Sequence, residues 1–201
     1  MEFVTEYGRV PLRYTEGEGK GLLLVFPGMH YPPDYPLLYY TRKSALYLGF
    51  GVLEAAYDLR PLPRPNRGKL LEELAHTALS WATERAPRVV LVGKSAGALV
   101  LALAPLGELE KPWSRVWLTP PLNQKAVQNA LARERKGFAV AGSADPYAPR
   151  EIWDALKGPG LKKLWLEDAD HRLESPDPVA SAQYLARYAE ELLVFLQAAF
   201  A

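Results

Sequence analysis

Residues 89–104 have the sequence VVLVGKSAGALVLALA. The four apolar residues at its start predict a short strand that is buried on both faces. Residues 98–104 are apolar on every side, which is typical of a central, buried helix. The GKSAG segment between them therefore forms a tight turn from strand to helix, and this turn carries Ser95.

The turn has the pattern G-x-S-x-G, with Gly93 two residues before Ser95 and Gly97 two residues after it. A serine at the tip of such a turn is strained, and its neighbours must lack side chains so that the strand and the helix can approach. The amide of Ala96 then lies at the helix N-terminus, where it can stabilise an oxyanion. The triplet GKS also ends a nucleotide-binding P-loop, but that motif requires glycine where this chain has Arg88, which excludes a phosphate cradle.

Outside this segment, strand and helix signals alternate along the chain. Short apolar runs predict further buried strands at residues 22–26, 51–57, 116–118, 138–141 and 164–166. Helical spacing of apolar residues marks residues 68–84, 124–135 and 177–200, and Asp177 followed by Pro178 is a start signal for the last helix. Residues 2–7 and 10–14, separated by Gly8 and Arg9, predict an antiparallel hairpin at the sheet edge. The fold class is therefore α/β, with a mainly parallel sheet, helices on both faces and right-handed crossovers.

Composition limits the possible functions. No repeat or linker divides the 201 residues, so we expect one domain over residues 1–201. A net charge of +1 lacks the basic excess that nucleic-acid binding needs, and the absence of cysteine excludes disulfides, thiolate metal sites and cysteine nucleophiles. No apolar run approaches the roughly 20 residues of a membrane span, and the opening residues lack the pattern of a signal peptide. We expect a cytoplasmic protein without a membrane partner, metal or cofactor.

The chain is also rich in proline and poor in heat-labile side chains. It has 18 prolines against three asparagines, four glutamines and two methionines. This balance favours a thermophilic source.

An acid and a base follow two of the later strands. The segment AGSADP, with Asp145, follows the strand at 138–141, and EDADH, with His171, follows the strand at 164–166. A serine hydroxyl needs a base to remove its proton, and an imidazole needs a carboxylate to fix its tautomer. An Asp before proline is often only a turn former, and His171 taken alone would be interpreted as an ordinary structural histidine. Three such residues at strand ends, in the order Ser, Asp, His, indicate a catalytic triad.

The segment PGMH, residues 27–30, follows the first buried strand. Its glycine lets the backbone curl so that the amide of Met29 can act as a second oxyanion donor. His30 follows the wrong strand to serve as the base in the order Ser, Asp, His. It is either a residue of the substrate pocket or a solvated loop histidine.

From about Leu22 to the C-terminus the chain resembles small α/β-hydrolase-fold proteins of the serine hydrolase superfamily. The likeness rests on GKSAG, GSADP, ADH, and PGM in the place where the family commonly has His-Gly-x. It implies Ser95 as nucleophile, His171 as general base and acid, Asp145 as the orienting carboxylate, and the amides of Ala96 and Met29 as the oxyanion hole.

Two residues depart from the family pattern. Pro27 stands in place of the usual histidine, which removes one side-chain hydrogen bond from the oxyanion loop. The GKSAG turn is the nucleophile elbow of this fold, and Lys94 is an uncommon residue at the position between Gly93 and Ser95. Its charge could lower the pKa of neighbouring groups or bind an acidic substrate end, or the side chain could extend to solvent.

The interval between the strands at 116–118 and 138–141 is too short for a lid domain, so we expect an open pocket without a cap. Candidate pocket residues are His30, Tyr31, Tyr35, Lys94 and Tyr147. Asp34, Lys94, Arg150 and Arg172 could each contact a polar substrate.

These features predict a serine hydrolase that cleaves a small carboxylic ester or thioester through an acyl-enzyme on Ser95. Two alternatives are a non-catalytic binding protein on the same fold and an acyltransferase that uses an acceptor other than water.

Overall fold

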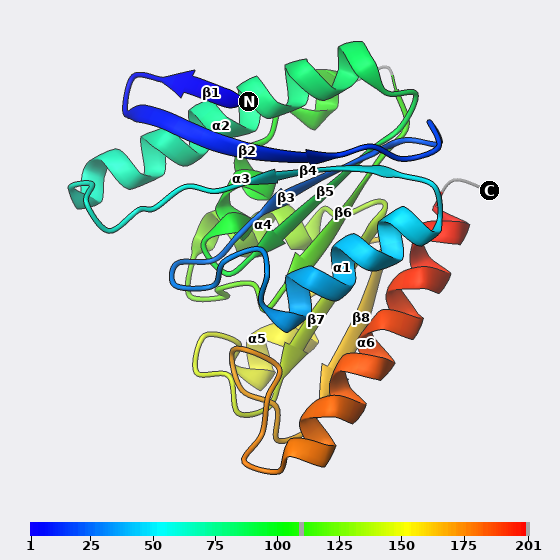
Figure 1. The fold of residues 1–201 in the computed structure, drawn as a ribbon. Helices are drawn as coiled ribbons and strands as arrows, with labels where there is room; N and C mark the ends of the chain where they lie inside the picture. Colours follow the sequence, from blue (N-terminus) through cyan, green and yellow to red (C-terminus); the bar gives the residue numbers. More distant parts are fainter. Residues whose placement is uncertain (109–110, 200–201) are drawn as a thin grey trace.

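The computed structural model describes residues 1–108 and 111–199. Its strands form one eight-stranded sheet in the order β1-β2-β4-β3-β5-β6-β7-β8 (Figure 1). The strands are β1 (Glu2–Thr5), β2 (Gly8–Thr15), β3 (Leu22–Phe26), β4 (Gly51–Ala55), β5 (Val89–Lys94), β6 (Trp113–Leu118), β7 (Gly137–Gly142) and β8 (Leu161–Leu166). Strands β3 to β8 pair parallel with one another, whereas β1 pairs antiparallel with β2, and β2 pairs antiparallel with β4. The expected fold class is confirmed.

Helices cover both faces of the sheet. The helices are α1 (Pro36–Tyr47), α2 (Arg64–Arg85), α3 (Gly97–Leu103), α4 (Lys125–Ala132), α5 (Arg150–Ala155) and α6 (Pro178–Ala198), with a short 3-10 turn at Leu106–Glu108. Figure 1 shows α1 and α6 side by side on one face. Buried side chains of α2 to α5 belong to the core on the other face.

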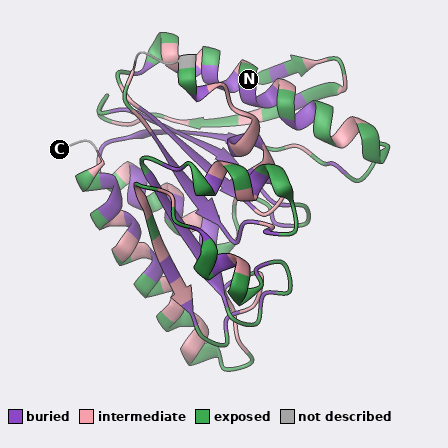
Figure 2. Ribbon diagram, turned by 180° about the vertical axis from the view of Figure 1, so that it is seen from behind, coloured by how far each residue is buried: buried purple, intermediate pink, exposed green. Residues whose placement is uncertain are grey.

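The core is split by the sheet into two layers. Leu91 and Trp117 point into the layer beneath α2, α3 and α4, while Val90, Val92 and Leu118 point toward α1 and α6. Every residue of β3, β4, β5 and β7 is buried, as the continuous apolar runs predict. In Figure 2 the buried residues gather on the strands, and the exposed residues lie on the outward sides of the helices.

Several element boundaries differ from the sequence-based expectation. Gly8 pairs with Thr5, so the hairpin turns at Glu6 and Tyr7 instead of Gly8 and Arg9. The helix at 124–135 ends early, at Ala132, because the side chain of Glu134 turns inward to bind two core residues. The prediction for the last helix is confirmed at its start, where the side chain of Asp177 accepts a hydrogen bond from the amide of Val179.

The connection between β6 and β7 contains α4 and no inserted domain. The ends of the central parallel strands are therefore left without a lid. Across the part of the chain that is described, no helix combines the length and the apolar character needed to cross a bilayer.

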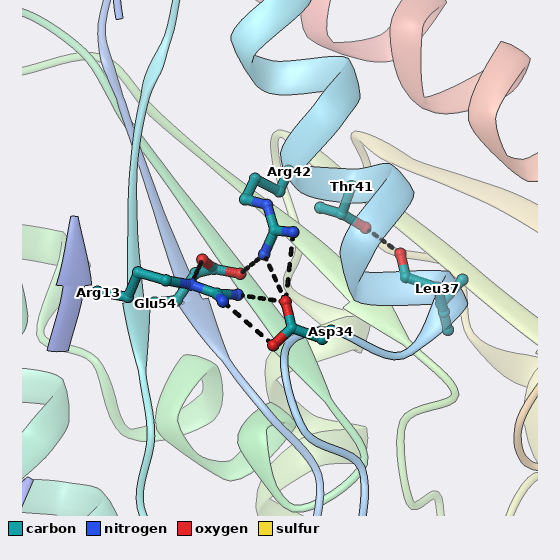
Figure 3. A network of polar contacts seen from close by, with 6 residues as sticks. All are labelled: Arg13, Asp34, Leu37, Thr41, Arg42 and Glu54. Atoms are coloured by element: carbon teal, nitrogen blue, oxygen red, sulfur yellow. Dashed lines mark hydrogen bonds and ion pairs between the residues drawn. The ribbon is translucent and has the colours of Figure 1, made fainter. Parts of the chain in front are cut away.

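A charge network fixes the segment that leads from β3 into α1 (Figure 3). Glu54 on β4 has no exposed side-chain area, and it accepts hydrogen bonds from Arg13 on β2 at 2.6 Å and from Arg42 on α1 at 2.8 Å. Arg13 also holds both oxygens of Asp34, at 2.9 and 3.1 Å, and this pairing lowers the pKa of Asp34. Residue 34 is thereby tied to the sheet and to α1.

Candidate active site

Ser95 lies on the turn between β5 and α3, at the carboxyl end of the sheet. Its φ of 52° is in the left-handed region, which is strained for a residue with a side chain. Hydrogen bonds hold the backbone of this turn on both sides. The amide of Ser95 donates to the carbonyl of Leu118 at the end of β6, at 3.0 Å, and the carbonyl of Ser95 accepts from the amide of Ala98 in α3, at 2.9 Å. This arrangement lifts the serine hydroxyl to the edge of the sheet.

The two glycines of the elbow are required by close packing. A Cβ at Gly97 would lie 2.1 Å from the carbonyl oxygen of Phe26, and a Cβ at Gly93 would lie 2.5 Å from the carbonyl oxygen of Gly97. Both distances are shorter than any tolerable contact with backbone. Only glycine at these positions lets α3 pack against β3 and β5 at this separation.

The histidine and the acid reach the same place from the ends of β8 and β7. Nε2 of His171 lies 2.8 Å from Oγ of Ser95, and Nδ1 of His171 lies 2.8 Å from Oδ2 of Asp145. The Asp145 side chain has no exposed area, whereas the His171 side chain is 23% exposed. The carboxylate thus assigns the imidazole proton to Nδ1 and leaves Nε2 free to accept the hydroxyl proton.

The acid turn and the histidine turn support each other. The second oxygen of Asp145 accepts the amide of Tyr147 at 2.9 Å, and Oγ of Ser143 accepts the amide of Asp168 at 2.7 Å. Within the histidine turn, Oδ1 of Asp170 accepts the amides of residues 172 and 174, at 2.7 and 3.0 Å. These bonds fix the backbone on both sides of His171.

The predicted oxyanion loop is a turn at residues 28–31. The amide of Tyr31 donates to the carbonyl of Gly28 at 3.2 Å, and His30 has a φ of 62°. A Cβ at Gly28 would lie 3.1 Å from Cβ of Ser95, so the loop passes close to the elbow. Within the described residues the amides of Met29 and Ala96 have no protein acceptor.

Tyr57, just after β4, is a supporting residue that the sequence analysis missed. Its hydroxyl donates to the carbonyl of Pro27 at 2.6 Å. Although the residue as a whole is partly exposed, its hydroxyl is enclosed, and this burial raises the pKa of Tyr57 and keeps the donor protonated. The bond anchors the loop that begins at Pro27.

A cavity of about 370 Å³ opens over the serine. It is lined by Met29, His30, Ser95, Ala96, Leu99, Pro121, Asn123, Gln124, Tyr147 and His171. Two of the candidate pocket residues, His30 and Tyr147, line this cavity, and the Tyr147 ring meets the His171 ring edge-on with 4.8 Å between the ring centres. Tyr31 and Tyr35 instead line an adjoining cavity of about 440 Å³ that shares His30 with the first, because the chain turns away from the serine after His30.

The expectation for Lys94 needs correction. Its side chain is 1% exposed and lines neither cavity, so it contacts neither solvent nor a substrate in them. Nζ donates to the carbonyl of His171 at 2.7 Å and lies 4.9 Å from the centre of the Tyr31 ring. Burial lowers the pKa of Lys94 to about 7, although the negative charges of Asp145 and Asp170 act in the opposite direction.

The other charged candidates also lie outside the cavity over the serine. Asp34 is held by Arg13 and Arg42 in the network of Figure 3, and Arg150 pairs with two surface carboxylates. Arg172 lines a small hollow between the start of α1 and α6. Over the described ranges, 1–108 and 111–199, no cluster of three metal-ligating side chains is present.

Known proteins share this architecture at low sequence identity. The sequence matches no family model and no curated protein. Among solved structures, Est1E from Butyrivibrio proteoclasticus has a TM-score of 0.78 at 14% identity, covering 99% of this chain and 98% of that one, and it has also been solved with ferulic acid bound. An esterase from Pyrococcus furiosus has a TM-score of 0.73 at 17% identity, covering 98% and 90%.

A serine hydrolase without a lid, from Xanthomonas campestris, has a TM-score of 0.72 at 13% identity, covering 98% of this chain and 92% of that one. At such identities the likeness concerns the fold, and it extends over almost the whole length of each protein. The chain is therefore a small protein of the α/β-hydrolase fold, in the form that has no lid.

Proposed function

We propose that the protein is a serine hydrolase that cleaves a carboxylic ester or thioester through an acyl-enzyme on Ser95. The observation that carries this proposal is the unbroken hydrogen-bonded chain from Ser95 Oγ through His171 to Asp145, with both links at 2.8 Å. Ser95, at one end of this series of hydrogen bonds, lies in the wall of an open cavity, where a substrate can reach its hydroxyl.

Acylation follows from this geometry. Oγ of Ser95 attacks the acyl carbon while its proton passes to Nε2 of His171, and the carbonyl electron pair moves onto oxygen. The amides of Met29 and Ala96, which have no protein acceptor in the described part of the chain, donate to that oxyanion. When the intermediate collapses, the bond to the leaving group breaks, and the alcohol or thiol takes the proton from Nε2.

Deacylation repeats the steps with water as the nucleophile. Nε2 of His171 takes a proton from the water as it attacks the acyl carbon. The intermediate collapses to the carboxylic acid, and the proton returns to Oγ of Ser95. Throughout the cycle the Asp145 carboxylate stabilises the imidazolium and stays ionised.

The cavity favours a substrate with a small acyl or aromatic group. Leu99, Pro121 and Met29 provide apolar wall, while the amide side chains of Asn123 and Gln124 supply polar contacts at the same cavity. Its volume of about 370 Å³ is near the lower end of ordinary ligand pockets. Est1E, which binds ferulic acid, gives a reason to include aromatic esters among the substrates tested.

The test compares the wild-type protein with Ser95→Ala. A fluorophosphonate should label the wild type and leave the variant unlabelled, and turnover of short acyl esters should fall by a factor on the order of 10⁴ or more. Equal labelling of the two proteins would refute the assignment of the nucleophile.

A panel of esters and thioesters, with and without added alcohols or amines, separates the remaining functions. Hydrolysis gives the free acid in every reaction, whereas an acyltransferase gives mainly the transfer product when an acceptor is present. A folded wild-type protein that neither reacts with fluorophosphonate nor turns over any ester would be a binding protein on this fold.

A further inference from the structure

Lys94 is adjacent to the nucleophile in sequence, but its side chain points to the opposite side of the sheet from α3. Side chains alternate along a strand, so Lys94 shares a face with Val92 and Val90, in the layer of α1 and α6. The side chain is 1% exposed, and it ends beneath the two turns that complete the site.

One side chain contacts both of these turns. Its ammonium donates to the carbonyl of His171 at 2.7 Å and lies 4.9 Å from the ring centre of Tyr31. Its stem passes under Gly28, where an added Cβ would lie 3.0 Å from Cδ of Lys94. The contacts therefore join the elbow, the histidine turn and both ends of the turn at 28–31.

Burial of the Lys94 amine costs free energy, because the amine loses its contact with water. A methionine would fill nearly the same space without burying an amine, so packing alone does not account for a lysine here. Asp145, Asp170 and Arg172 are the charged groups that act on Lys94, and the two carboxylates only partly offset the desolvation of its ammonium. Among the described residues, the hydrogen bond to the carbonyl of residue 171 is a contact that the lysine makes and a methionine could not.

We propose that Lys94 is a positioning residue that holds His171 and the oxyanion turn in register with Ser95. The effect of Lys94 on turnover rests on the proposed hydrolase function, whereas the contacts of its side chain do not depend on that function. Fixing the carbonyl of His171 fixes the backbone from which the imidazole projects, and thereby the 2.8 Å distance from Nε2 to Oγ. A misplacement of about 1 Å between reacting groups can lower the rate about 100-fold.

The test compares Lys94→Met with Lys163→Met. Lys163 is a matched control, because its Nζ also donates to backbone carbonyls, those of Trp153 and Leu156, and lies over an aromatic ring away from the site. In Lys94→Met, kcat and the rate of fluorophosphonate labelling should fall about 10- to 100-fold, as expected when the imidazole is no longer held in position, with KM changed less than about twofold. Lys163→Met should keep both rates within about twofold of the wild type.

Rates within twofold of the wild type in folded Lys94→Met would overturn the proposal. If that variant does not fold, Lys94→Gln takes its place, because its amide is too short to reach the carbonyl and the same loss is expected.

A second readout does not depend on turnover. The proton on Nδ1 of His171, which is hydrogen-bonded to Asp145, should give a distinct low-field NMR signal in the wild type. In Lys94→Met this signal should broaden or disappear through faster exchange with water, and it should persist in Lys163→Met. A wild type without ester turnover or labelling would refute the hydrolase function but not the positioning role of Lys94. The NMR signal would then test that role by itself. An unchanged signal in Lys94→Met would overturn it.

Discussion

The buried amine of Lys94 makes the stability of the protein depend on pH in a defined direction. An exposed lysine has a pKa of 10.5, whereas burial lowers the pKa of Lys94 to about 7. Below pH 7 the amine is protonated in both the folded and the unfolded chain, so it adds no pH dependence. Between pH 7 and about pH 10 the unfolded chain holds a proton that the folded chain has lost. Unfolding then takes up a proton, and the free energy of unfolding rises with pH.

The magnitude follows from the same two pKa values. The contribution rises by up to about 1.4 kcal/mol per pH unit, which amounts to roughly 2 to 3 kcal/mol between pH 6 and pH 9. The upper end of the window is set by buried tyrosines, because burial raises the pKa of Tyr31 to about 12 and raises that of Tyr188 as well. An unfolded chain ionises its tyrosines near pH 10, so these residues lower the stability above that pH.

Lys94→Met isolates the effect. Urea unfolding of the wild type and the variant, followed by tryptophan fluorescence at pH 6, 7, 8 and 9, should give stabilities whose difference changes by roughly 2 to 3 kcal/mol in favour of the wild type as the pH rises. Lys162→Met is the control, because the Lys162 ammonium pairs with Glu191 at the surface, and its curve should run parallel to that of the wild type. Parallel curves for the wild type and Lys94→Met would show that the amine carries the same charge in both states, and the reasoning would fail.

Three further predictions concern the site and its support. Asp145→Asn should lower kcat by a factor on the order of 10⁴ in a protein that stays folded by circular dichroism, because the imidazole loses its tautomer; a loss below tenfold would contradict the role of the carboxylate. Tyr57→Phe removes the bond to the carbonyl of Pro27 and should lower kcat about tenfold with little change in KM, as measured by initial rates on a short ester, whereas a change confined to KM would place Tyr57 in substrate binding instead. Arg42→Met leaves the buried Glu54 with one partner, and urea unfolding should show a loss of about 3 kcal/mol; an unchanged stability would mean that Arg13 alone satisfies the carboxylate.

The parts of the fold that follow from local patterns could be predicted from the sequence. Buried parallel strands are continuous apolar runs, and the elbow needs glycine at two fixed positions, as the contacts of Gly93 and Gly97 explain. Asp177 and Pro178 mark the start of α6 through the chemistry of one helix end. Each of these signals is contained within a few adjacent residues.

Helix α1 was not predicted, for a reason visible in its buried face. Thr41 and Ser44 are buried there, so the apolar period of the sequence is interrupted. The Thr41 hydroxyl donates to the carbonyl of Leu37 at 2.7 Å and also contacts the hydroxyl of Tyr188 on α6. Polar groups satisfied by a distant helix cannot be recognised as core positions from the local sequence.

The orientation of Lys94 could have been predicted, but its partners could not. Side chains alternate between the two faces of a strand, and the Cβ direction of Gly93 faces α3. The side chain of Lys94, the next residue, must therefore lie on the other face of the sheet. A lysine so close to the end of a strand can often reach solvent, and only the packing of the turns around Tyr31 and His171 closes that route. Tyr57 is a similar case, because its contact with Pro27 joins residues 30 positions apart.

These distant contacts together explain how the turn at residues 28–31, the proposed oxyanion loop, is held in place without a histidine at position 27. Tyr57 fixes the carbonyl of Pro27 just before the turn, and the network of Arg13 and Glu54 fixes Asp34, which follows the turn. Lys94 supports the turn between them from below. Donors that stabilise an oxyanion are most effective when they are already in position before the charge develops. Anchors at both ends and beneath the middle meet that requirement, so loss of any one of them should lower the turnover number more than the affinity for substrate.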